Sequence, residues 1–252
     1  LAAAPSLCRR AEPRSLSPMQ SASSLSRTAR RVYGALAGVL WFGVALSLGL
    51  DIFHVYPTTE TNPHMLAFTD ATAIDRVVDL ASYFTIWSNA IAAFVLTQLA
   101  LGRWSGTERE RVLRADSVLM MSVTGIVYSY LLAGERELQG LQHLTNAIQH
   151  YWGPALVVAT WAIFGPRGWF KPSHIVTALA IPIVWLLYSL LRGAVIGAYP
   201  YPFVDVLEYG YGPVLTTVAM IVAFGMFLGA LFFGLDRLLG RFVGAGASER
   251  AA

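Results

Sequence analysis

The sequence predicts an all-α integral membrane protein, a six-transmembrane-helix bundle whose N- and C-termini are cytoplasmic. Of its 252 residues, 56% are hydrophobic and only 13% are charged, and the mean hydropathy is +0.55. The chain is therefore far more apolar than an ordinary soluble domain. Apolar stretches of about 18 residues or more, each long enough to span a hydrocarbon core of about 30 Å, recur along it. The segregation of basic residues predicts the orientation.

Each apolar stretch predicts one helix. Leu, Val, Ala and Phe dominate these stretches, which favours helices over the alternating pattern of a membrane β-barrel. The expected spans are 32–50, 80–101, 117–133, 147–165, 174–196 and 211–235. The chain is thus expected to have three parts: a disordered tail rich in Arg and Ser at 1–31, a transmembrane domain at 32–242 and a short tail at 243–252.

Basic residues are concentrated in every second connection between the expected helices. If the first helix starts in the cytoplasm, the inner connections hold most of the basic residues and the outer ones most of the acidic residues, as the positive-inside rule requires. The inner basic residues are Arg103, Arg109, Arg111, Arg114, Arg167, Lys171, Arg237 and Arg241. The net charge of +3 therefore reflects topology and predicts no nucleic-acid partner. The excess of Arg over Lys favours a high-GC bacterium, and hence a multi-pass protein of the bacterial inner (plasma) membrane.

Three hydrogen-bonding residues share one face of the second expected helix. Ser88 and Asn89 follow Thr85 by three and four positions, so the three side chains form one stripe along the helix. In hydrocarbon such a stripe is expected to face the interior of the bundle. A structural interpretation is also open: Thr85 and Ser88 can bond to carbonyls one turn earlier, and Asn89 can join two helices.

The fourth expected helix carries a matching polar face, formed by His143, Asn146 and His150. Thr85 and His150 lie 18 and 17 positions, respectively, before the first arginine that follows each of them. At about 1.5 Å per residue, both side chains are about 26 Å from the cytoplasmic end of their helices. The two residues are therefore expected to meet in one layer near the outer boundary of the membrane.

Further polar residues are expected at the same outer end. Arg192 lies near the end of the fifth expected helix, where an arginine is costly, and Asp51 or Asp205 is its expected ion-pair partner. Tyr201 belongs to the aromatic run YPYPF, which is suited to act as a lid over a lipid-facing pocket. A structural ion pair and an interfacial belt of tyrosines are the alternative interpretations.

Three motifs resemble one known family. The segments YFTIWSN, QHYWGP and SLLRGAVIGAYPYPFVD are similar to those of six-helix membrane proteins related to the androgen-induced-gene-1 protein and the androgen-dependent TFPI-regulating protein, in particular their bacterial branch. The resemblance covers roughly residues 32–235. It implies that Thr85 and His150 are the catalytic pair of a threonine-type intramembrane hydrolase that cleaves fatty acid esters of hydroxy fatty acids.

This chemistry is consistent with the residue types. A threonine hydroxyl becomes a nucleophile when a base such as a neutral imidazole takes its proton. The attacked carbonyl then needs hydrogen-bond donors for its oxyanion, and Asn89, Tyr83 or Arg192 are candidates for that role. No cofactor is expected, and membrane lipids are the expected partners.

Two other functions stay open. A non-enzymatic lipid-binding or scaffold protein would use the same polar layer without covalent chemistry. A metal-dependent hydrolase is less favoured: His54, His64, His143 and His150 lie on or near the outer side, but no HExxH or comparable spacing accompanies them. No metal ligand is therefore predicted, and the sequence leaves the oligomeric state undecided.

Overall fold

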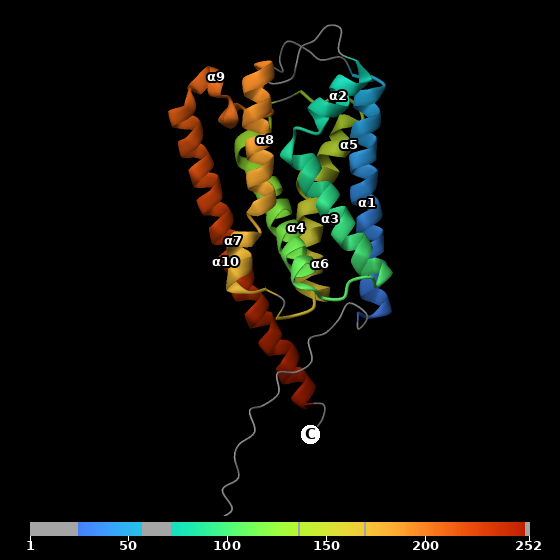
Figure 1. Ribbon diagram of the computed structural model, residues 1–252. Helices are drawn as coiled ribbons and strands as arrows, with labels where there is room; N and C mark the ends of the chain where they lie inside the picture. Colours follow the sequence, from blue (N-terminus) through green and yellow to red (C-terminus); the bar gives the residue numbers. More distant parts are fainter. Residues whose placement is uncertain (1–24, 57–71, 136, 169, 250–252) are drawn as a thin grey trace, which may run out of the picture.

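The computed structural model describes residues 25–56, 72–135, 137–168 and 170–249, the last eight by their backbone alone. All regular secondary structure in this part of the chain is helical, and the long helices run side by side as one bundle (Figure 1). Most of the expected tail at 1–31, together with His64, lies outside the described residues. The first residues of α1 and the last residues of α10 lie at the same end of the bundle (Figure 1).

Each of the six apolar stretches is mainly helical in the structure. In chain order the elements are α1 (Arg27–Ile52), α2 (Ala73–Leu80), α3 (Phe84–Leu101), α4 (Glu108–Val127), the π-helix η2 (Tyr128–Leu132), α5 (Gln142–Asn146), the π-helix η3 (Ala147–Trp152), α6 (Gly153–Phe164), α7 (Pro172–Thr177), α8 (Ala180–Ile196), the 3₁₀-helix η4 (Pro202–Val204), α9 (Val206–Tyr209) and α10 (Tyr211–Glu249). Because α1 begins at Arg27 and α10 ends at Glu249, helix extends into both stretches that were expected to be tails.

Five rods among the described residues are long and apolar enough to cross a membrane. They are Arg27–Ile52, Phe84–Leu101, Glu108–Leu132, Pro172–Ile196 and Tyr211–Arg241. The stretch expected at 147–165 is also helical, since α5, η3 and α6 follow one another without a break, but it is not one of the five. Its first half carries polar side chains such as Gln149 and His150, which lower its mean hydropathy. The chain is thus an all-α bundle of membrane-spanning character.

Two expected spans begin differently in the structure. The stretch from residue 80 is divided: α2 ends at Leu80 and a short turn leads into α3 at Phe84. Thr72 starts α2 by accepting a hydrogen bond from the Asp75 backbone N–H, and Asp75 bonds back to the Thr72 N–H in a capping box. The bonds from Thr72 also lower the pKa of Asp75. The fifth span is likewise divided by a turn between α7 and α8.

The core has two parts. A large apolar cluster joins α1, α3, α4 and α6 through residues such as Leu40, Leu99 and Met121, and it fills the half of the bundle nearer the start of α1. A smaller aromatic cluster around Trp185 and Tyr201 fills the other half, where α3, α8 and the loop after α8 meet. The second cluster surrounds the polar layer described below.

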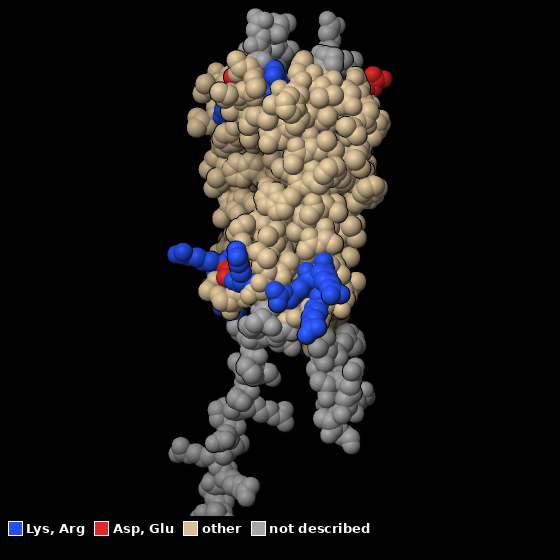
Figure 2. Space-filling model, turned by 90° about the vertical axis from the view of Figure 1, so that its right-hand side faces the viewer, with Lys and Arg blue, Asp and Glu red and all other residues tan. Residues whose placement is uncertain are grey.

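Charges gather at the ends of the bundle. On the face that Figure 2 shows, Lys and Arg side chains collect toward one end, and the broad band between the ends is uncharged. At the basic end Glu108 of α4 contacts Lys171 Nζ at 2.7 Å and His174 Nε2 at 2.9 Å, which ties α4 to α7. An uncharged band between two polar ends is the surface expected of a membrane-spanning bundle.

Candidate active site

The expected meeting of Thr85 and His150 is confirmed. Thr85 Oγ1 lies 3.1 Å from His150 Nε2, although 65 positions separate the two residues in the chain. Thr85 is in the first turn of α3 and is only 8% exposed. The N-terminal turn of a helix carries a partial positive charge, which favours a negative charge next to Thr85.

Two π-helical segments bring His150 to this place. His150 lies in η3, while the neighbouring rod contains η2, which begins at Tyr128. The Tyr128 ring stacks on the His150 ring, with a centroid distance of 3.8 Å and an interplanar angle of 18°. A π-helical turn holds an extra residue and therefore rotates the side chains that follow it, and such turns are frequent at functional sites. Sequence periodicity contains no signal for them, and Tyr128 was accordingly missed.

The polar stripe of α3 is buried as predicted. Ser88 and Asn89 have no exposed surface. Ser88 Oγ donates to the Thr85 carbonyl at 3.0 Å and accepts from Thr124 Oγ1 of α4 at 2.8 Å. This stripe therefore both holds the first turn of α3 and joins α3 to α4.

Asn89 forms hydrogen bonds to the backbone of both segments that carry the pair. Its Nδ2 donates to the carbonyl of Thr85 at 2.9 Å and to the carbonyl of Gln149, the residue before His150, at 3.2 Å. Both amide hydrogens are therefore used within the protein, which favours the structural interpretation of Asn89. Its Oδ1 is buried and has no hydrogen-bond partner among the described residues. Asn89 positions the pair instead of acting on a ligand.

Gln149 anchors η3 on its other side. Its Nε2 donates to the carbonyl of Gly43 and to Ser47 Oγ of α1, each at 3.0 Å. The side chain is 5% exposed. Gln149 did not stand out in the sequence, because a single Gln at the start of an apolar stretch is unremarkable without knowledge of its partners. The segment that carries His150 is thus hydrogen-bonded to α1 and to α3.

Tyr201 is the residue of the aromatic loop that reaches the pair. Its hydroxyl lies 3.4 Å from Thr85 Oγ1 and accepts from the Thr85 backbone N–H at 3.5 Å. Its ring packs edge-on against Tyr83 at 5.7 Å and stacks on Phe203 at 5.1 Å. A phenol O–H beside the threonine oxygen is a suitable donor for an oxyanion.

Two cavities meet at Thr85. One, with about 870 Å³ of empty space, has almost wholly apolar walls, and the other, with about 1420 Å³, is lined by many polar groups; both volumes include space open to the exterior. Four residues line both cavities: Thr85, Tyr128, Leu132 and Tyr201. The polar lining of the larger cavity consists of Ser47, Asp51, Tyr83, Thr85, Tyr128, Glu135, Gln142, Thr145, Asn146, Gln149, His150 and Tyr201. The pair therefore stands between an apolar and a polar compartment.

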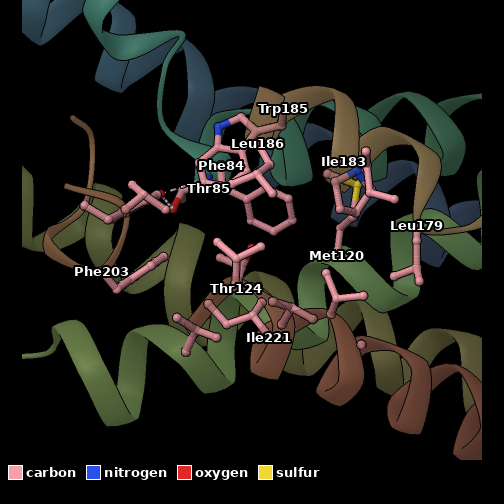
Figure 3. Close-up of a pocket in the computed structure, with 18 of the residues that line it drawn as sticks. Phe84, Thr85, Met120, Thr124, Leu179, Ile183, Trp185, Leu186, Phe203 and Ile221 are labelled. Atoms are coloured by element: carbon pink, nitrogen blue, oxygen red, sulfur yellow. Dashed lines mark hydrogen bonds between the residues drawn. The ribbon is translucent and has the colours of Figure 1, made fainter. Parts of the chain in front are cut away.

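Figure 3 shows the apolar cavity from the side. Thr85 and Phe203 lie at one end of it and Leu179 lies at the opposite end, with Met120 and Ile221 on the walls between them. Its lining residues come from α3, α4, η2, α8 and α10, from the turn before α8 and from the segment after α8. Its shape and lining suit a flexible apolar ligand whose reactive end reaches Thr85.

Three other predicted site residues lie elsewhere. His143 is exposed and lines neither cavity, because the π-helical turn of η3 breaks the regular face that it was expected to share with His150. Arg192 forms its ion pair with Asp79 at 3.0 Å, not with the expected Asp51 or Asp205. Asp205 instead caps α9 by accepting from two backbone N–H groups, at 2.9 and 3.1 Å. Arg192 lines neither cavity.

The comparisons with known proteins identify no relative. No family model, no curated protein and no solved structure matches this chain. Among the described residues, no three His, Cys, Asp or Glu side chains come together as a metal ion would require.

Proposed function

We propose that this chain is an intramembrane threonine-type hydrolase of lipid esters. One observation carries the proposal: the Thr85 hydroxyl and a His150 ring nitrogen are 3.1 Å apart where an apolar and a polar cavity meet. A nucleophile within hydrogen-bond distance of a base is the signature of covalent catalysis. The apolar compartment suits an acyl chain, and the polar compartment suits water and the alcohol part of an ester.

In the first step the ester becomes attached to Thr85. His150 Nε2 accepts the proton of the Thr85 hydroxyl while Thr85 Oγ1 forms a bond to the ester carbonyl carbon. The carbonyl oxygen becomes an oxyanion, which the Tyr201 O–H and the N-terminus of α3 stabilise. The bond from the carbonyl carbon to the alcohol oxygen then breaks. The proton on His150 passes to that oxygen, so that an alcohol leaves and the acyl group remains on Thr85.

In the second step water releases the acid. A water molecule from the polar cavity gives a proton to His150 as its oxygen attacks the acyl-Thr85 carbonyl. The bond to Thr85 Oγ1 breaks, and His150 returns the proton to that oxygen. A carboxylic acid leaves, and the pair regains its starting state. Asn89 and Gln149 hold the two segments in place throughout, through the hydrogen bonds described above.

The proposed setting is a six-span topology with both termini in the cytoplasm of a bacterium and the site near the outer face of its plasma membrane. The basic end of the bundle supports this orientation, and the rod from α5 to α6 is the sixth span. The proposed substrates resemble fatty acid esters of hydroxy fatty acids, the class that the family resemblance implies.

Labelling by a fluorophosphonate probe tests the activity. The purified protein should be labelled, and Thr85→Ala should abolish labelling. Thr97→Ala is the matched control, because Thr97 lies on the same helix, bonded to the Ala93 carbonyl and to Trp41 and away from both cavities. Equal labelling of all three proteins would exclude Thr85 as the nucleophile. The non-enzymatic lipid-binding or scaffold alternative would then stand first, because the apolar cavity suits a lipid whether or not chemistry follows.

A further inference from the structure

The apolar cavity extends from Thr85 at one end to Leu179 at the opposite, inner end. We call this cavity the acyl chamber; its polar lining, Thr85, Thr124, Tyr128 and Tyr201, belongs to residues at or near the end where it meets the polar cavity. The rest of its lining is apolar, and the residues toward the inner end include Leu119, Met120, Val123, Leu179, Pro182, Ile183, Ile221, Val222 and Gly225. Among the described residues no polar side chain other than these four polar residues and Trp185 lines the chamber, so the chamber is suited to a hydrocarbon chain.

The length of the chamber follows from its walls. On α4 its lining runs from Val127 to Leu119, and on α10 it runs from Val218 to Gly225. At about 1.5 Å per residue these runs are about 12 Å and about 10 Å long. A chain attached at Thr85 therefore has a limited depth to occupy before it meets the inner end or must turn aside.

Gly225 and Leu179 face each other at that inner end. A Cβ atom added to Gly225 would lie 3.2 Å from Leu179 Cδ2, and it would meet nothing else within 4 Å. The nearest atom is the tip of a side chain that itself lines the chamber. A larger residue at position 225 would therefore take space from the chamber, whereas a smaller one at position 179 would add space.

We propose that Gly225 and Leu179 set the length of the acyl chain that the site accepts. The inference rests on the proposed hydrolase function and adds a specificity determinant to it. Chain atoms that fit the chamber are held along its walls, and atoms in excess of its depth force the ester away from the Thr85–His150 geometry. Reaction rate is sensitive to such displacement, because the nucleophile must approach the carbonyl carbon closely.

The test is a chain-length profile of hydrolysis. Initial rates are measured for p-nitrophenyl esters from butanoate to tetradecanoate, with the purified full chain in a nonionic detergent. Gly225→Val should move the optimum to acyl chains shorter by about two carbons, since the added methyl groups occupy chamber volume. Leu179→Ala should move it to longer chains by a similar amount, since it removes volume from the same wall. Opposite shifts from the two variants are not expected of a general loss of stability.

Gly234→Val is the matched control. Gly234 also lies on α10, it is exposed, and a Cβ there would meet no atom within 4 Å. Its profile should equal that of the unchanged protein. An unchanged optimum in folded Gly225→Val and Leu179→Ala proteins would overturn the inference and leave the hydrolase function standing. An unchanged protein that hydrolyses no ester of any length would contradict the hydrolase function and this inference together.

Discussion

The strongest prediction concerns the joint action of Thr85 and His150. A general base typically contributes about 10²–10⁴ in rate, or about 3–5 kcal/mol of transition-state stabilisation. If the 3.1 Å contact is the proton-transfer step, either Thr85→Ala or His150→Ala should remove that whole factor. The double variant should then be scarcely slower than either single one, because residues that act as a unit are not additive.

The assay is the initial rate of hydrolysis of a medium-chain p-nitrophenyl ester by the purified variants. Independent contributions would multiply, so the double variant would be slower by about 10⁴–10⁸. That outcome, or a fully active Thr85→Ala protein, would refute the catalytic pair. Thr85→Ser should keep part of the activity, since it keeps the hydroxyl, and Thr97→Ala should keep all of it.

Three other predictions follow from the same structure. Hydrolysis should fall as the solution is acidified, because a protonated His150 cannot accept the Thr85 proton; a rate that is the same in neutral and in acidic buffer would argue against His150 as the base. Asn89→Ala should lower the free energy of unfolding by about 2–3 kcal/mol, because two buried hydrogen bonds are lost, and it should also slow hydrolysis. Thermal unfolding in detergent measures the first effect and initial rates measure the second. Unchanged stability and rate would show that the Asn89 hydrogen bonds do not position the pair. In intact cells, with Cys8 replaced by Ser, a cysteine at Thr107 should be protected from an impermeant thiol reagent and one at Glu137 should react, whereas the reverse pattern would invert the proposed topology.

The sequence by itself determined where the helices form and how far along their length the site lies. Helix formation in an apolar stretch depends on local composition and length, and the rise per residue is constant, so the height of a residue can be counted. This is why the meeting of Thr85 with His150, which comes from a distant part of the chain, was predictable. The burial of Ser88 and Asn89 followed from the cost of placing polar groups against lipid.

Only the tertiary structure decided which way the side chains of each helix face and which polar side chains pair with one another. The π-helical segments η2 and η3 change which side chains face the pair, and the Tyr128 ring stacks on His150 while His143 is exposed. Several acidic residues were possible partners for Arg192, and the tertiary structure places Asp79 of α2 beside it. The two cavities likewise depend on how side chains from distant helices fill space, a property that no single stretch of sequence carries.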